Sequence, residues 1–389
     1  MARRKDRTRS SGNKSSTRVS NGTTALLGRQ PDLGVAQSHD STEVEPEALV
    51  VSHWIDPGEA GEPFPVTIRL SGQRADVDGR PAPADSFTHE EVIDQVAPGS
   101  GPISVSSWVY GLTPGVWNVS GEIVHRDRHS AGHIAVTRTE PLARAGWSWR
   151  HWSLKPSPAT PIKTRWALTA QLARIPGVMP GSYTALFGVG LIVALASQLA
   201  ILASEQIAVP RSVVVSLLAL SAGLIGAKLW SIVLHPGEPV LKGGWAVDGF
   251  LLTAPLVAIA ALIVFGLPVG AYLDATAPGL FFAIAIGRIG CFLTGCCAGR
   301  VTSSRWGIWS SDRKIGARRI PTQLMESAAG LLIGTAALPL TLLHFKAVHG
   351  AVFIVALAVY LVVRQMLLRL RVEARRYSWQ RTGLAHERA

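Results

Sequence analysis

The distribution of apolar residues divides the chain into two halves of different character. Residues 1–180 are largely polar, whereas residues 181–370 consist mainly of long apolar runs. A helix needs about 20 predominantly apolar residues to cross the hydrocarbon core of a bilayer. The segments that meet this requirement are 183–203, 212–233, 246–266, 272–294, 324–343 and 350–370. The pattern therefore predicts a multi-pass α-helical membrane domain of about six to seven spans over residues 179–371.

A different pattern precedes the spans. Between residues 46 and 140, short runs alternate apolar and polar positions, and turn residues such as Asp56-Pro57-Gly58 and Thr113-Pro114-Gly115 separate them. Many short alternating strands with regular turns are typical of an antiparallel β-sandwich. The stretch Trp108–Val119 is similar to the late strands of immunoglobulin or fibronectin type III modules. We therefore predict an all-β sandwich domain over 46–140.

Three further segments complete the predicted organisation. Residues 1–45 are rich in Ser, Thr, Gly and charge, so we expect a disordered basic N-terminus. No apolar stretch follows its basic start, so no secretory signal peptide is predicted. Residues 141–178 carry four Trp among basic residues and are either an interfacial segment or a plain linker. Residues 372–389 form a basic tail.

The charge of the chain adds a preference for its partners. The formal net charge is +12, and basic residues such as Arg369, Arg375 and Arg376 lie beside a predicted span. This placement favours membrane topology and anionic lipid over nucleic acid as the explanation. No nucleic-acid motif is present, and the sequence predicts no cofactor.

Ionisable residues inside a predicted span are costly and therefore mark candidate functional sites. Lys228, Asp248, Arg288 and Arg364 occupy such positions. Glycines flank Arg288, and its guanidinium can hold a phosphate or carboxylate through two parallel hydrogen bonds. The alternative is a structural arginine paired with a carboxylate such as Asp248 or Glu326.

The three cysteines of the chain, Cys291, Cys296 and Cys297, lie within seven residues of one another. Structural metal sites usually take four soft ligands, and three cysteines without a neighbouring histidine fall short of that. We therefore predict no metal. Packing of small residues between helices is the favoured explanation, and acylation or thiol chemistry stays open.

The segment Gly287–Arg300 reads Gly-Arg-Ile-Gly-Cys-Phe-Leu-Thr-Gly-Cys-Cys-Ala-Gly-Arg. It resembles the signature of the prolipoprotein diacylglyceryl transferase family, Gly-Arg-x-Gly-Asn-Phe-x-Asn-Gly-Glu-x-x-Gly-Arg. Further blocks follow in the family's order: Trp306-Gly307, Ile320–Glu326, and Tyr360–Arg364. Its cysteine-rich form resembles a distinct branch of the family.

The resemblance implies an activity and a set of site residues. The family moves the diacylglyceryl group of phosphatidylglycerol to the lipobox cysteine thiol of a prolipoprotein, in the bacterial plasma membrane. The expected partners are phosphatidylglycerol, the prolipoprotein signal peptide and the membrane. Catalytic roles are implied for Arg288, Arg364, Asp248 and Glu326. Substrate-binding positions are implied for Tyr183, Lys228, Gly249, Gly290, Cys291, Gly295, Arg300 and Gln323.

Departures from the family pattern leave alternatives open. Asp248 stands where the family has a histidine, so it is a candidate base or the partner of Lys228 or Arg288. Cys291, Thr294 and Cys296 replace two Asn and one Glu of the signature. One alternative is therefore a non-catalytic or altered relative that binds anionic phospholipid and presents the β-domain to a partner. Another is a transferase with a different acceptor.

The orientation in the membrane also has two solutions. Six spans place both chain ends on one side, and the basic loop 300–319 and the basic tail favour the cytoplasm for that side. The family arrangement implies the opposite side for this loop and for the β-domain.

Overall fold

A computed structural model gives the structure of the protein. It describes residues 47–59, 61–77, 82–126, 137–141, 161–170, 172–173, 175–234, 247–343 and 348–372. The predicted disordered N-terminus, most of the Trp-rich segment and nearly all of the basic tail lie outside these residues.

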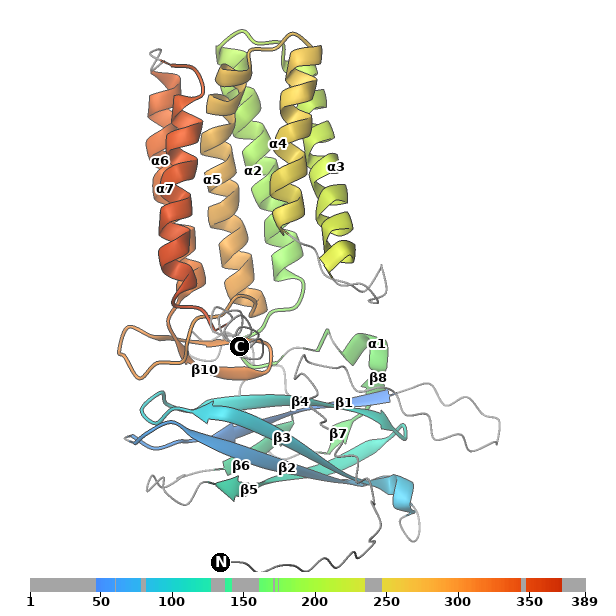
Figure 1. Ribbon diagram of the computed structural model, residues 1–389. Helices are drawn as coiled ribbons and strands as arrows, with labels where there is room; N and C mark the ends of the chain where they lie inside the picture. The colour runs from blue at the N-terminus through green and yellow to red at the C-terminus, as the bar shows by residue number, and fades with distance from the viewer. Residues whose placement is uncertain are drawn as a thin grey trace, which may run out of the picture. The chain divides into compact units, whose positions relative to one another are not determined.

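Two antiparallel sheets make up the β-domain (Figure 1). One sheet has the order β6-β1-β4-β10-β9, with β8 also paired to β1, and the other has the order β3-β2-β5-β7. The strands of the first sheet are β1 (Glu47–Ile55), β4 (Ile103–Leu112), β6 (Thr137–Pro141), β8 (Arg165–Trp166), β9 (Ile308–Ser311) and β10 (Ile315–Arg319). Those of the second are β2 (Phe64–Arg74), β3 (Ser86–Val96), β5 (Val116–Arg126) and β7 (Ile162–Lys163).

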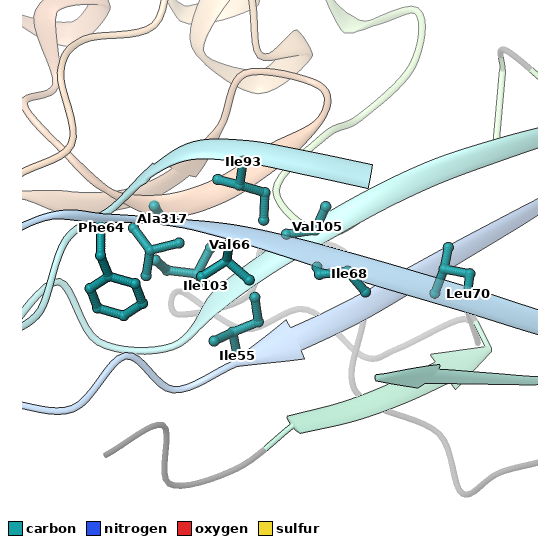
Figure 2. Close-up of a cluster of buried hydrophobic side chains, with 10 residues drawn as sticks. Ile55, Phe64, Val66, Ile68, Leu70, Ile93, Ile103, Val105 and Ala317 are labelled. Carbon is teal, nitrogen blue, oxygen red and sulfur yellow. The ribbon is translucent and has the colours of Figure 1, made fainter. Parts of the chain in front are cut away.

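The core of the β-domain lies between the two sheets. Along β2 every second residue is buried, namely Phe64, Val66, Ile68 and Leu70, because successive side chains of a strand point to opposite faces. Figure 2 shows these side chains meeting residues of β1, β4 and β10 in one apolar cluster. Burying each large apolar side chain stabilises the fold by about 1.5–3 kcal/mol. The period-2 pattern that predicted strands is thus the pattern that forms this core.

The β9–β10 hairpin is an unexpected part of this domain. It comes from the loop between α5 and α6, some 200 residues after β4 in the chain. β10 pairs with β4 at Ile315↔Val105 and Gly316↔Ser104. Ala317 of β10 is fully buried in the core shown in Figure 2. Two short strands from the segment 141–178, β7 and β8, also add to the sheets.

His53 makes the stability of the β-domain depend on pH. It is buried on β1 between β4 and β6, and burial lowers its pKa to about 4. In the unfolded chain a histidine titrates near pH 6.5, so the unfolded state binds more protons between these values. Stability is therefore full above about pH 6.5 and falls as the pH drops toward 4, by about 3 kcal/mol in total. Chemical denaturation of the whole protein at pH 7 and pH 4.5 measures this loss, and His53→Leu is expected to reduce it. An equal acid loss in that variant would contradict the assignment.

The remaining elements are helices. The long ones are α2 (Ser182–Ser204), α3 (Val209–Leu234), α4 (Val247–Val264), α5 (Val269–Thr294), α6 (Thr322–Leu342) and α7 (Ala351–Leu368). A short helix α1 (Ala167–Ala170) and one 3-10 turn (Pro83–Asp85) precede them. Within the described residues, five helices are long and apolar enough to cross a membrane: α2, α3, α5, α6 and α7.

Close backbone contacts join the helices in pairs. α2 packs along α5, α5 along α6, and α3 along α4 (Figure 1). At Gly279 of α5 an added Cβ would lie 2.5 Å from the carbonyl oxygen of Ala194, and at Gly249 of α4 it would lie 2.3 Å from that of Gly226. Small residues let two helix backbones approach closely. Such close packing favours helix association inside lipid, where no hydrophobic effect drives it. Gly249 thus lies where α4 packs closely on α3. Its implied role in substrate binding stays a prediction.

Asp274 of α5 caps the start of α7. Its carboxylate accepts hydrogen bonds from the backbone N–H groups of Gly350 (2.7 Å) and Phe353 (3.0 Å). The first turn of a helix has unpaired N–H groups, and α7 has no side-chain cap of its own. We expect Asp274→Ala to lower the free energy of unfolding by about 3 kcal/mol, because two charge-assisted bonds are lost. Denaturant titration in mixed micelles measures the change. Asp274→Asn retains an acceptor and is expected to lose less, and equal losses would contradict the capping role.

Candidate active site

A single carboxylate gathers three guanidinium groups near one end of the helices. Glu326 lies about one turn inside α6 and is completely buried. Its Oε1 accepts hydrogen bonds from Tyr360 Oη (2.7 Å) and Arg364 Nη1 (2.6 Å). The same oxygen forms an ion pair with Arg288 Nη2 at 2.8 Å. Glu326 Oε2 accepts a hydrogen bond from Arg371 Nη2. The carboxylate of Glu326 on α6 is therefore contacted by side chains from α5, from α7 and from the segment after α7.

Local geometry explains how these side chains meet. Tyr360 and Arg364 are four residues apart on α7, so they share one helical face. Arg371 follows the end of α7, where its backbone forms an antiparallel bridge with Gly299. Arg288 comes from the last two turns of α5. Glu326, one of the two carboxylates considered as structural partners of Arg288, pairs with it.

The cluster carries more positive than negative charge. Three guanidiniums face one carboxylate, so its formal charge is about +2. The Arg371 side chain is 6% exposed, and within the described part of the chain its Nε is buried without a hydrogen-bond partner. Arg288 and Arg364 are 16% and 26% exposed. Buried charge without compensation is costly, so this arrangement favours the binding of an anion.

The loop after α5 is held in a compact form. Gly295 ends α5 with φ of +75°, and a Cβ there would lie 2.7 Å from the carbonyl oxygen of Ser311. Gln323 Nε2 donates to the carbonyl of Cys296 (2.9 Å). Thr294 Oγ1 accepts from the backbone N–H of Tyr183 (3.1 Å), which ties the start of α2 to the end of α5. Gln323, Gly295 and Tyr183 therefore position the signature loop. Gly290 allows α5 to lie close to the start of α2, since a Cβ there would lie 3.1 Å from Cα of Tyr183.

The cysteines border the cationic cluster. All three lie in the described residues and form no disulfide. Cys291 Sγ is 3.9 Å from Arg288 Nη1, and Cys296 Sγ is 3.6 Å from the carbonyl oxygen of Cys291. Hydrogen bonds with the Cys291 and Cys296 thiols, together with the charges of Arg371 and Arg288, lower the pKa of Cys297, while burial opposes them. In the described part of the chain, no group of three His, Cys, Asp or Glu is arranged to hold a metal ion.

Arg300 lies next to the strand-like segment that carries Arg371. Its backbone N–H donates to the carbonyl of Leu370 (3.0 Å), and its Nη2 donates to the carbonyl of Arg369. Arg300 thus contacts the backbone beside the cluster. Its role as a substrate-binding residue stays a prediction.

Three of the predicted positions belong to another part of the helical domain. Lys228 is half-buried on α3, and Asp248 and Gly249 open α4, which packs on α3. In the view of Figure 1, α2 and α5 lie between the pair α3–α4 and the pair α6–α7. The Asp248 side chain is outside the described residues. The assignments of Asp248 and Lys228 therefore stay predictions.

Two residues of the cluster were not predicted as site residues. Tyr360 stood in a matched block, and its spacing of four from Arg364 is the signal that places both on one face. Arg371 follows Arg364 by seven residues, which is about two helical turns. Because α7 ends at Leu368, helical spacing alone would not have placed Arg371 correctly.

Arg319 is a further buried cation close to this region. It is 2% exposed, and it donates to the carbonyl of Gly299 (3.1 Å) and to Asp312 Oδ2 (2.7 Å). Burial lowers the pKa of Arg319, and the Asp312 carboxylate opposes this shift. In the sequence it is indistinguishable from its neighbour Arg318, so only the fold identifies it as buried.

Comparison with known proteins decides the family. Residues 171–385 match the family model described as prolipoprotein diacylglyceryl transferase. The chain belongs to this family. The predicted resemblance is thereby confirmed, and the five long apolar helices identify this family member as a multi-pass membrane protein.

Relatives with the same name align only in part. Phosphatidylglycerol–prolipoprotein diacylglyceryl transferase 2 of Streptomyces coelicolor is 33% identical over 178 residues, 41% of this chain and 56% of the relative. Transferase 1 of the same organism is 30% identical over 167 residues, 39% of this chain and 48% of the relative. The Dehalococcoides mccartyi transferase is 28% identical over 122 residues, 28% of this chain and 47% of the relative. The chain spans about half the length of the curated relatives it matches.

Proposed function

We propose that the chain transfers the diacylglyceryl group of phosphatidylglycerol to the lipobox cysteine thiol of a prolipoprotein. The observation that carries the proposal is the cluster in which one buried carboxylate, Glu326, faces Arg288, Arg364 and Arg371. The names of the relatives support the same activity.

The cluster suits a phosphodiester in a membrane. An excess of about two positive charges, with the partly exposed guanidiniums of Arg288 and Arg364, matches a phosphate held by several charge-assisted hydrogen bonds. The helices that carry the arginines are apolar on their outer surfaces, so a lipid tail is compatible with the surroundings. Low dielectric strengthens these contacts relative to water. A phospholipid head group is the anion that fits both features.

The proposed reaction is a displacement at carbon. The acceptor thiolate forms a C–S bond to the glyceryl carbon of the diacylglyceryl group, and the C–O bond to the phosphate breaks. Glycerol phosphate leaves with the electron pair of that bond. Negative charge therefore grows on the phosphate oxygens, and Arg288 and Arg364 stabilise it best if they are preorganised. The thiol proton must go to a base before the attack, because the thiolate is the nucleophile.

We assign the carboxylates different roles. Glu326 is engaged by three guanidiniums and the Tyr360 hydroxyl, so it orients the cations and is poorly placed to take a proton. Asp248 stays the proposed base, on the strength of its position in the sequence. Asp248→Asn is expected to lower the transfer rate about 100-fold with little change in stability, as for loss of a general base.

The finer architecture belongs to the same proposal. We infer that α4, 18 residues long, crosses the membrane together with α2, α3, α5, α6 and α7 to give six spans. The two antiparallel sheets with a shared core are compatible with an immunoglobulin or fibronectin III-like sandwich. The location we propose is the bacterial plasma membrane.

The test is a transfer assay with phosphatidylglycerol labelled in its acyl chains and a lipobox peptide. The native chain is expected to label the peptide thiol, and Arg288→Ala is expected to abolish labelling. Arg69→Ala is the matched control, since Arg69 lies on β2 in partly exposed ion pairs with Glu90 and Glu122. Absence of transfer by a folded native chain, beside an active family member, would reject the proposal.

A second candidate, transfer to a different acceptor, rests on the cysteines at the cluster. Cys291 contacts Arg288, and Cys297 has a lowered pKa, which favours its thiolate. Under the first proposal Cys291→Ser and Cys297→Ser retain peptide labelling. Loss of labelling in these variants, with label on the native chain itself, would favour the second candidate.

A further inference from the structure

The β9–β10 hairpin is shared between the helical domain and the β-domain. Besides the pairing of β10 with β4, Trp309 stacks on Trp54 with ring centroids 5.8 Å apart. Trp309 Nε1 donates to the carbonyl of Pro102 (2.9 Å), and Lys314 Nζ lies 2.5 Å from Glu91 Oε1. The backbone N–H of Ser106 donates to the carbonyl of Lys314 (2.8 Å). Backbone, aromatic and ionic contacts thus hold the hairpin on the β-domain.

The β9–β10 hairpin is tightly packed against the β-domain. A Cβ on Gly316 would lie 2.4 Å from Ser104 Oγ and 2.6 Å from the Trp309 ring. Ala317 is fully buried among residues of both sheets (Figure 2). Because close-packed interiors transmit displacement, β10 moves with the β-domain.

Backbone hydrogen bonds continue from β10 to the cationic cluster. The N–H of Thr302 donates to the carbonyl of Arg318 (2.9 Å), and the N–H of Ile320 donates to the carbonyl of Arg300 (3.0 Å). The segment 298–300 then pairs with the segment that follows α7. There the Arg300 N–H donates to Leu370 and the Val372 N–H donates to Ala298, with a bridge between Gly299 and Arg371.

A buried side chain reinforces the same connection. Arg319, the last residue of β10, donates to the carbonyl of Gly299 (3.1 Å), the residue that bridges to Arg371. Arg371 in turn binds Glu326, the centre of the cluster. A continuous series of bonds therefore runs from β4 through β10 and residues 299–302 to Arg371.

We propose that the β-domain is a positioning element of the anion site, and that it acts through β10 to hold Arg371 against Glu326. Arg371 lies beyond the end of α7, so helix geometry does not fix its place. Its backbone is held by Gly299, which β10 orders. The proposal rests on the proposed function only for the choice of phosphatidylglycerol as the ligand.

The expected effect is on binding of the anionic head group. Displacing a positioned group by about 1 Å can cost about 100-fold in rate, even when the change lies far from the chemistry. Loosening of Arg371 removes one of three cations, so we expect about a 10-fold weaker affinity for phosphatidylglycerol vesicles, the usual effect of losing one hydrogen bond to a charged group. Binding to phosphatidylcholine vesicles is expected to change less, because that head group has no net charge and is attracted less by the cations.

The test uses the full-length protein with two docking variants, Trp309→Ala and Gly316→Val. Trp309→Ala removes the stack and the bond to Pro102, and Gly316→Val adds atoms where none fit. The control variant is Arg69→Gln, which alters exposed ion pairs of β2 away from β10. Hydrogen exchange at 299–302 and 370–372 reports the proposed loosening, and vesicle binding reports its consequence.

The outcomes separate this proposal from the proposed function. Faster exchange at both segments with weaker phosphatidylglycerol binding, and unchanged exchange in α2 and α5, supports it. Unchanged exchange at 370–372 or unchanged binding in folded docking variants overturns it. Faster exchange throughout α2 and α5 also overturns it, because the β-domain would then serve general stability. Lack of transfer by the native chain rejects the proposed function alone, since vesicle binding is read without transfer.

Discussion

Replacing Glu326 with glutamine is expected to lower the free energy of unfolding by about 3–5 kcal/mol, the usual loss when one partner of a buried ion pair is removed. The carboxylate is completely buried and is the acceptor for Arg288, Arg364 and Arg371. Glutamine has nearly the same shape, but it leaves three guanidiniums together without a compensating charge. Denaturant titration of the purified protein in mixed micelles measures the difference.

The control for this prediction is Glu90→Gln. Glu90 is half-exposed and lies 2.9 Å from Arg69, so we expect a change below about 1 kcal/mol. Phosphatidylglycerol in the micelles is expected to restore part of the stability of Glu326→Gln, because a bound anion replaces some of the lost charge. A loss no larger than that of Glu90→Gln would show that the carboxylate does not hold the cluster together.

Replacing Arg288 with lysine is expected to lower the transfer rate by about 100- to 1,000-fold, which is the effect of losing one preorganised donor to a developing charge. Lysine keeps the charge, but its ammonium is a point donor and cannot bridge Glu326 and a phosphate in one plane. Arg288 has the geometry for both, since one Nη binds Glu326 while the side chain stays 16% exposed. Turnover at saturating phosphatidylglycerol measures the effect.

Arg69→Lys is the matched control for the arginine-to-lysine change. Arg69 is 37% exposed and belongs to partly solvated pairs, so its replacement is expected to leave transfer unchanged. Arg364→Lys is expected to behave as Arg288→Lys does, because Arg364 binds the same Glu326 oxygen. Activity of Arg288→Lys within threefold of the native chain would mean that charge alone is required, and that the planar fork has no role.

Local patterns in the sequence predicted much of this structure. Apolar runs long enough to cross a bilayer became α2, α3, α5, α6 and α7. The alternation of apolar and polar residues along Phe64–Leu70 corresponds to the buried and more exposed faces of β2. Both patterns depend only on neighbouring residues, since helix length and strand alternation are properties of a local segment. The ordered motif blocks also placed Arg288, Gln323, Glu326 and Arg364 at the loop and helices where the cluster forms.

The partners of these residues were decided only by tertiary structure. Arg288 pairs with Glu326 because α6 packs against α5 at that depth. The joining of β10 to β4, and the capping of α7 by Asp274, likewise link segments far apart in the chain. Arg371 enters the cluster after α7 has ended, where no helical period applies. The sequence by itself determined the helices and strands and the kinds of side chain at the site. Contacts between segments far apart in the chain decided which charged side chains meet, because those contacts depend on how the elements pack in space.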